Sequence, residues 1–535
     1  MIIKSDQTGE ESKMQAKTFS PCTWIYPDTE CDRKDTSISV DIARGGMAAF
    51  QILTDITLKK ETPVKILWEN AFSLENTVYQ LIAVCVDQNS GKDVLTGPYD
   101  AVKEYATREA PYYVFDAMRE IDNGLISKGR LAFYVKMEAP GTMVPGEKKT
   151  ALCFEIGNET YRMDINVRVH PAKIPDLKHA SFGMVNWLNI EQMCQQHHVN
   201  VSDPEFEEIL IRYLENQLEM RNTQLQIPSG VPVRDENGKV VFFDFSLAEK
   251  VGSLALKHGF QYILGGFVAR FKIWDEKTHY LLWDRDVSIA SHEGYRQLKL
   301  YFTEIEKLIR KNGWQGKYMQ TLVDEPQFPN SDHYRVLSSI CRRFLPGVPI
   351  HDPVESTLLD GALDIWDVKQ AVYEKYLDEY KALQDMGEEM WLYTCGFPAG
   401  KMMNRVMDLP LTASILPMWM CYLYDCKGFL HWGYNVHTEM PFEKTCYQPE
   451  PEHPEIAYPA GNAHIVYPGI NGPMWSVRAM LQRIGAEDYE LFRLLDKKDS
   501  ELARKLARKA CTSFSEYTFD GEKVDEIRRE ILKSI

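Results

Sequence analysis

The first third of the chain carries a strand pattern. Over residues 163–170, the apolar residues Met163, Ile165, Val167 and Val169 alternate with polar ones, which is the two-residue period of a half-buried strand. Further apolar runs predict strands at 37–40, 48–53, 79–86 and 151–156. Since no long helical period competes with them, we predict an N-terminal β-sandwich over residues 15–172.

After Pro175 the pattern changes to strands that alternate with helices. Strands are predicted at 182–187, 223–227, 262–267, 318–323, 348–352, 362–366, 390–394 and 428–434, with helices that include 205–220, 295–311, 331–343 and 368–386. Eight strands with helices between them are typical of a (β/α)8 TIM-like barrel. The predicted fold class is therefore multidomain, β and α/β, with the barrel over residues 176–500. Residues 501–535 are predicted to form a C-terminal helical tail packed on the barrel.

Composition and charge narrow the class of partner. The 535 residues include 61 Lys and Arg against 77 Asp and Glu, a net charge of −16, which disfavours nucleic acid and anionic membranes as partners. No run of eighteen apolar residues and no apolar leader is visible. The 11 scattered cysteines form no CxxC pair, which is typical of a reducing compartment. We expect a cytoplasmic protein, or a secreted one whose leader has been removed. The oligomeric state is left open.

Candidate chemistry lies where the predicted strands end, since barrel enzymes place their active sites there. The fourth strand ends in Asp324 and Glu325, and the aromatic or polar residues at later strand ends are Trp366, Tyr393, Trp432, Tyr434 and Asn435. Carboxylates among aromatic rings suit a carbohydrate, whose apolar face packs on the rings. The alternative is structural: an Asp-Glu pair can cap a loop, and buried aromatic residues are often core.

Other side chains give weaker evidence for a metal site or a catalytic nucleophile. His197 and His198 have no carboxylate or cysteine at ligand spacing, so no metal site is predicted, and no cofactor motif is present. Cys395 has no identifiable histidine partner and is predicted to be a structural thiol.

The adjacency of Asp324 and Glu325 is itself informative. Two-carboxylate glycosidases place their groups on opposite sides of the bond that they cleave, about 5 to 9 Å apart. Neighbours in sequence favour a different division of labour on one face of the sugar. One group protonates the leaving oxygen, while the other orients a 2-acetamido group of the substrate that acts as the nucleophile.

Several segments resemble glycoside hydrolase family 123, the β-N-acetylgalactosaminidases. They are Val323-Asp324-Glu325-Pro326, the aromatic strand 391–395, Gly428 to Asn435, and a C-terminal set at 467–469, 476–478 and 485–490. The resemblance implies a β-sandwich followed by a (β/α)8 barrel, and retaining hydrolysis through an oxazolinium-like intermediate. It also implies that Glu325 is the acid/base and that Asp324 holds the acetamido N–H. The last segment is expected to be structural, with Arg478 pairing with Glu487 or Asp488.

The sequence thus predicts an exo-glycoside hydrolase that removes terminal β-N-acetylgalactosamine by substrate-assisted catalysis. Two alternatives stay open: a glycosidase of another sugar on the same fold, and a non-catalytic carbohydrate-binding protein.

Overall fold

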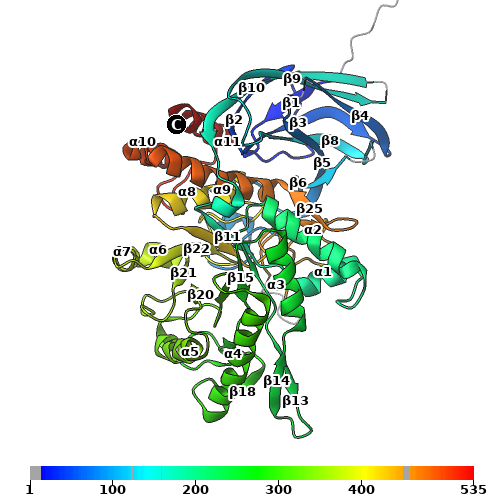
Figure 1. Cartoon of the computed structure of the whole chain (residues 1–535). Coiled ribbons are helices and arrows are strands. Elements are labelled where there is room, and N and C mark those ends of the chain that lie inside the picture. The colour runs from blue at the N-terminus through cyan, green and yellow to red at the C-terminus, as the bar shows by residue number, and fades with distance from the viewer. Residues whose placement is uncertain (1–13, 71, 122–123, 158, 450–456) are drawn as a thin grey trace, which may run out of the picture.

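The computed structural model describes residues 14–70, 72–121, 124–157, 159–449 and 457–535. Two regions follow each other along the chain (Figure 1). A two-sheet region, at the top of the view, is built mainly from the first 173 residues. A parallel-strand region with its helices lies below it.

The two-sheet region consists of two largely antiparallel sheets packed face to face. The larger has the order β1 (Ala16–Phe19), β3 (Met47–Leu58), β8 (Gly129–Glu138), β5 (Glu75–Val86), β6 (Tyr112–Glu120), β25 (Pro473–Ser476) and β24 (Tyr467–Pro468). The smaller has the order β2 (Ser37–Arg44), β10 (Glu159–Lys173), β9 (Gly146–Ile156), β4 (Thr62–Glu69) and β7 (Leu125–Ile126). Apolar side chains of both sheets form one core, in which the rings of Phe133 and Phe154 are 4.7 Å apart. The alternating residues of β10 therefore bury one face of that strand, as predicted.

Strands β24 and β25 come from the far end of the chain. Trp475 and Ser476 of β25 pair with Met118 and Ala117 of β6, so a segment that follows the parallel strands completes the edge of an N-terminal sheet. The two regions are thereby joined through backbone hydrogen bonds as well as by the linker after β10.

The parallel-strand region contains two sheets. One has the order β11 (Gly183–Asn186), β23 (Gly428–His431), β22 (Glu389–Thr394), β21 (Ile365–Lys369) and β20 (His351–Val354), and the other is β12 (Gln224–Gln226), β15 (Tyr262–Gly265) and β19 (Tyr318–Gln320). A single bridge links Gln320 to Ile350, and a hydrogen bond of 2.9 Å joins Thr223 N to Met184 O. The predicted eight strands are all present, but they do not form one closed, continuously hydrogen-bonded barrel.

Helices cover the parallel strands. They are α1 (Ile190–His197), α2 (Glu205–Glu219), α3 (Ser246–His258), α4 (His292–Asn312), α5 (Ser331–Phe344), α6 (Gln370–Lys375), α7 (Leu377–Asp385) and α8 (Leu416–Leu423). Between β20 and β21 a loop, described throughout, replaces the expected helix. A hairpin of β13 (Val231–Arg234) and β14 (Val240–Asp244) follows β12. Strands β16 (Ala269–Arg270), β17 (Tyr280–Leu281) and β18 (Asp284–Ser288) form a small sheet after β15.

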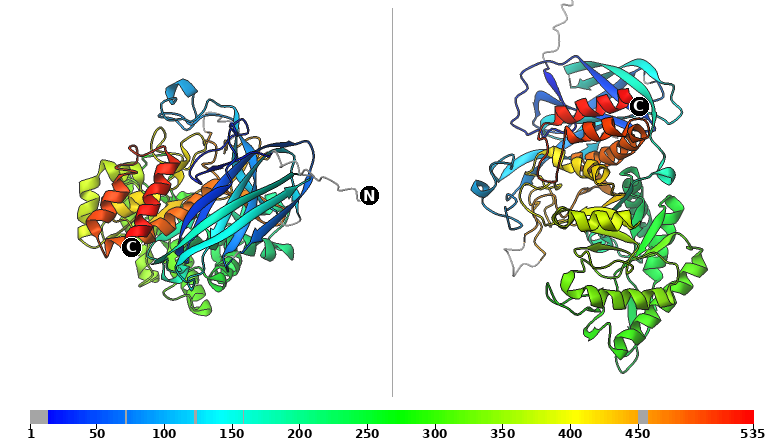
Figure 2. Two further views of the ribbon diagram at one scale, coloured as in Figure 1. Left: turned by 90° about the horizontal axis from the view of Figure 1, so that it is seen from above. Right: turned by 90° about the vertical axis from the view of Figure 1, so that its left-hand side faces the viewer.

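The chain ends in three helices, α9 (Val477–Asp496), α10 (Ser500–Arg508) and α11 (Gly521–Ser534), which lie along the boundary between the regions (Figure 2). Helix α11 contacts α9 and α10 and also strands β2 and β10 of the two-sheet region. Within the described ranges, no helix is both long enough and apolar enough to cross a bilayer. All 11 cysteines lie within those ranges, and each is unpaired.

Candidate active site

Asp324 and Glu325 lie on a short irregular segment after β19, at the carboxyl ends of the parallel strands. Pro326 disfavours right-handed helical backbone at Glu325, which adopts the left-handed conformation with φ of 51°. A non-glycine residue held in this conformation stores of order 1 kcal/mol or more of strain, as is common at functional sites. The segment is therefore built to present these two side chains.

Neighbouring strands hold this segment in place. Glu325 N donates to Pro353 O over 3.1 Å, and Glu355 N donates to Pro326 O over 3.0 Å. Just upstream, the buried carboxylate of Asp352 accepts the Leu322 N–H at 2.8 Å. Asp352 is thus a buried anchor for the segment that leads to Asp324.

Glu325 is engaged by three side chains. The Lys369 ammonium, at the end of β21, lies 3.0 Å from Glu325 Oε1, the Tyr393 hydroxyl at the end of β22 donates to the same oxygen, and Cys395 Sγ lies 3.8 Å from it. The Glu325 side chain is only 15% exposed. The ammonium and the phenol hydroxyl thus both contact one oxygen of Glu325 and fix its side chain in the site. Burial, ahead of repulsion from Glu325, raises the pKa of the Cys395 thiol to about 12, so this cysteine is not a ready nucleophile.

Asp324 differs from its neighbour. Its side chain is exposed in the site. Desolvation by the surrounding protein, and then the charges of Glu325 and Glu355, raise the pKa of Asp324 to about 8, while Lys369 opposes the rise. In the free protein Asp324 therefore holds its proton to a higher pH than an ordinary aspartate does.

An aromatic wall stands beside the pair. The half-buried rings of Trp432 and Tyr458 are 4.9 Å apart, and Trp432 Nε1 donates to Asn462 Oδ1 over 3.1 Å. Burial, with smaller contributions from Cys395 and then Glu325 and Asp324, raises the pKa of Tyr458 to about 12. The Tyr458 hydroxyl therefore lies within electrostatic reach of the carboxylate pair and stays protonated.

Three predicted site residues lie elsewhere. Trp366 is fully buried, donates to Glu388 Oε2 over 3.1 Å, and contacts the ring of Tyr380 on α7. Tyr434 is fully buried and donates to Asn216 of α2. Asn435 is fully buried and bonds the backbone of Asn189 at both its N–H and its carbonyl. The structure thus brings Asp324, Glu325, Tyr393 and Trp432 together, but these three side chains support the surrounding framework instead.

Sequence reasoning missed several members of the site. Glu355 directly follows β20 and Lys369 is the last residue of β21, and both strands were predicted to end too early. Tyr458 lies in a loop that has no local sequence pattern. Trp274 was also missed. It is 52% exposed, and its ring centroid lies 5.7 Å from the Lys369 ammonium. Its loop is held against the segment that follows Asp324 and Glu325 by a hydrogen bond of 3.1 Å from Asp275 N to Gln327 Oε1.

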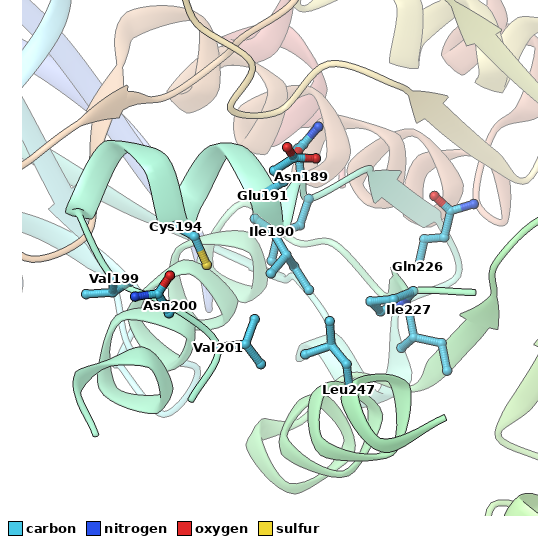
Figure 3. A pocket seen from close by; sticks show the side chains of 12 residues that line it. Asn189, Ile190, Glu191, Cys194, Val199, Asn200, Val201, Gln226, Ile227 and Leu247 are labelled. Carbon is cyan, nitrogen blue, oxygen red and sulfur yellow. The ribbon is translucent and has the colours of Figure 1, made fainter. Parts of the chain in front are cut away.

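A separate pocket of about 500 Å³ opens beside the ends of β11 and β12 (Figure 3). The side chains of Ile190, Val201 and Leu247 converge in it, and Asp324 and Glu325 are not among its lining residues. Among the residues that the structure describes, no three His, Cys, Asp or Glu side chains are grouped to hold a metal ion.

Residues 187–495 match the family model of the glycoside hydrolase 123 catalytic domain, which is more than half of the chain. The chain belongs to glycoside hydrolase family 123. It is a glycoside hydrolase, and Asp324 and Glu325 lie within the matched range. No curated protein matches the chain.

Solved structures agree with the family assignment at the level of the fold. The family 123 glycoside hydrolase from Clostridium perfringens, studied for glycolipid glycan hydrolysis, aligns over 97% of both chains with a TM-score of 0.75 and 12% identity. A GH10 xylanase with a bacterial Ig-like domain from termite gut aligns over 85% of this chain and 100% of its own, with a TM-score of only 0.36 and 11% identity. That second likeness is too slight to carry an argument.

Proposed function

We propose that this family 123 enzyme is a retaining exo-glycosidase that removes terminal β-linked N-acetylgalactosamine, with the substrate's own 2-acetamido group as nucleophile. The observation that carries the proposal is the adjacency of Asp324 and Glu325 on one strained segment. Two neighbouring residues cannot easily flank a glycosidic bond from opposite sides, so they act on one face of the sugar.

In this mechanism Glu325 gives its proton to the leaving oxygen as the bond from that oxygen to C1 breaks. The acetamido carbonyl oxygen bonds to C1 and forms the oxazolinium ring. Meanwhile the Asp324 carboxylate accepts a hydrogen bond from the acetamido N–H and stabilises the positive charge on the ring. Glu325 then takes a proton from water as the water oxygen bonds to C1 and the bond from C1 to the acetamido oxygen breaks, which restores the acetamido group. The Lys369 ammonium and the Tyr393 hydroxyl stabilise the Glu325 carboxylate between the two steps.

The raised pKa of Asp324 in the free protein fits this sequence of events. A hydrogen bond to a carboxylate favours its ionised form, so an acetamido N–H that binds Asp324 displaces the proton held there. Substrate binding thus leaves Asp324 charged and the pair able to keep one proton on Glu325.

The proposed substrate is the glycan of a glycoconjugate. The Clostridium perfringens relative was studied for hydrolysis of glycolipid glycans, and the net charge of −16 favours a neutral sugar over a polyanion. The rings of Trp432, which contacts Tyr458, and of Trp274, which lies beside Lys369, offer apolar faces for sugar rings.

Nitrophenyl glycosides that differ in one group test the proposal. We expect turnover of the β-N-acetylgalactosaminide, release of the β-anomer as first product, and rates at least about 10²-fold lower on the β-galactoside, which has no acetamido group to close on C1. Comparable turnover of the β-galactoside would instead support a glycosidase of another sugar. No turnover and simple sugar binding would support the carbohydrate-binding alternative.

A further inference from the structure

Three carboxylates, not two, meet at the ends of the parallel strands. Asp324 and Glu325 follow β19, and Glu355 follows β20. Lys369 at the end of β21 supplies the ammonium group that they share. Its Nζ lies 3.0 Å from Glu325 Oε1 and in still closer contact with Glu355 Oε1. The Lys369 side chain is only 9% exposed and the Glu355 side chain 16%, so the contacts form in a poorly solvated setting.

One cation cannot neutralise three such anions. Burial raises the pKa of Glu355 and repulsion from Glu325 adds to the rise, while Lys369 opposes both. Although burial works against it, Cys395, Glu325 and Glu355 together hold the pKa of Lys369 above its usual value. The cluster therefore keeps Lys369 charged and retains a proton on one of its carboxylates near neutral pH.

This sharing has a consequence for Glu325 as a proton donor. Lys369 and Tyr393 both stabilise the Glu325 carboxylate, which works against keeping a proton there. The Glu355 carboxylate, which also contacts Lys369, offsets this attraction, because an ammonium group shared with Glu355 attracts Glu325 less strongly. The charged or titratable groups that face the cluster are Asp324, Glu325, Glu355, Lys369, Tyr393, Cys395, Tyr458, Asp275 and Tyr380. Lys369 is the cation nearest to Glu325 among them.

We propose that Glu355 is a positioning residue of the active site, which shares the Lys369 ammonium with Glu325 and, by offsetting its attraction, allows Glu325 to carry the proton that the leaving oxygen needs. The inference rests on the proposed function. When the O–H bond of Glu325 breaks and the proton passes to the glycosidic oxygen, the new carboxylate attracts Lys369 more strongly. When Glu325 later takes a proton from water, this attraction weakens again.

The test is the pH profile of Glu355→Gln. Without the Glu355 charge, Lys369 pairs with Glu325 alone and makes Glu325 release its proton more easily. The alkaline limb of the kcat/KM profile should therefore move to lower pH by about one unit. At pH 7, kcat should fall about 10-fold or more on an oligosaccharide and much less on the nitrophenyl glycoside. Lys369→Met should move the limb the opposite way, and Glu355→Asp, which keeps the charge, should restore much of the wild-type profile.

The matched control is Glu389→Gln. Glu389 forms a 3.0 Å pair with Lys427 at the other end of β22, so its loss removes a comparable Glu–Lys contact away from the site. Its pH profile should stay in place.

A folded Glu355→Gln enzyme with an unmoved alkaline limb would overturn the proposal. So would an equal loss on both substrates together with covalent labelling of Glu355 by a 2-fluoro glycoside, which would make it a nucleophile. If Glu355→Gln does not fold, the alkaline limbs of the Lys369→Met and Glu355→Asp profiles test the proposal in its place.

If the wild type hydrolyses no N-acetylhexosaminide, the proposed function fails. The Glu355–Glu325 coupling is then read by carbon-13 NMR of carboxyl-labelled glutamates, with the Glu325 signal assigned from Glu325→Gln. That signal should titrate at lower pH in Glu355→Gln, and an unchanged titration would contradict the coupling.

Discussion

Arg478 on α9 and Asp116 on β6 form an ion pair that joins the two regions of the protein. The guanidinium donates to Asp116 Oδ2 from Nε over 3.0 Å and from Nη2 over 2.8 Å, and both side chains are fully buried. Its Nη1 also donates to the carbonyls of Arg405, Gly461 and His464. The predicted pairing of Arg478 with Glu487 or Asp488 is therefore wrong, since those two carboxylates pair with Arg483 and Arg528. Arg478 instead fixes the loop that carries Asn462, the partner of Trp432.

Removing one member of this pair should strongly destabilise the protein. Asp116→Ala leaves a buried guanidinium without its counter-ion, so the free energy of unfolding should fall by about 3 to 5 kcal/mol. Denaturant unfolding measures this change. Glu147→Ala, which breaks the exposed pair with Arg168, is the control and should cost less than about 1 kcal/mol. A similar small loss for Asp116→Ala would show that the pair does not hold the regions together.

Trp432 should contribute binding energy to the sugar. Trp432→Ala removes the ring that packs on Tyr458, and substrate affinity should fall by about fivefold or more, since a stacking contact with the sugar is worth roughly 1 kcal/mol. Trp432→Phe should keep most of the affinity. Phe519, an exposed aromatic residue before α11, supplies the control variant Phe519→Ala. Affinity within about twofold of wild type in Trp432→Ala would rule out stacking.

The raised pKa of Asp324 should make stability depend on pH. A carboxyl group whose pKa is about 8 in the folded protein and near its usual value when unfolded binds a proton more tightly in the folded state. Its ionisation therefore destabilises the fold progressively as pH rises from about 4 to 8. Asp324→Asn removes this dependence, so the difference in Tm between variant and wild type should grow in favour of the variant across that window. A constant difference would contradict the assigned shift.

The parallel strands could be predicted from the sequence because their apolar runs are short and bounded by polar residues. Strands β20 and β21 were placed about three residues too early. Both strands contain buried polar side chains, including His351 of β20 and Asp367 of β21. His351 Nε2 lies 2.7 Å from Asp367 Oδ2 in a fully buried pair. The apolar pattern stops where that pair begins, so Lys369 was assigned to a helix and Trp366 to a strand end.

The remaining differences arise from long-range contacts. Tyr458 contacts Trp432 across a long separation in sequence, and β25 pairs with β6, a strand that lies more than 300 residues earlier. Neither leaves a local pattern. By contrast, Asp324 and Glu325 stood out because two carboxylates follow an apolar strand and precede a proline, and Glu325 has a left-handed backbone conformation.

The measurement that bears most directly on the mechanism compares two variants on two leaving groups. Glu325→Gln should lose roughly 10² to 10⁴ in rate on a natural sugar aglycone, and much less on a nitrophenyl glycoside in the step that forms the oxazolinium ring, because that leaving group needs little protonation. Asp324→Asn should be impaired equally on both substrates, because no leaving group replaces its electrostatic role. Rescue of Asp324→Asn but not of Glu325→Gln by the activated leaving group would reverse the roles, and near-normal rates for both variants on both substrates would contradict the account.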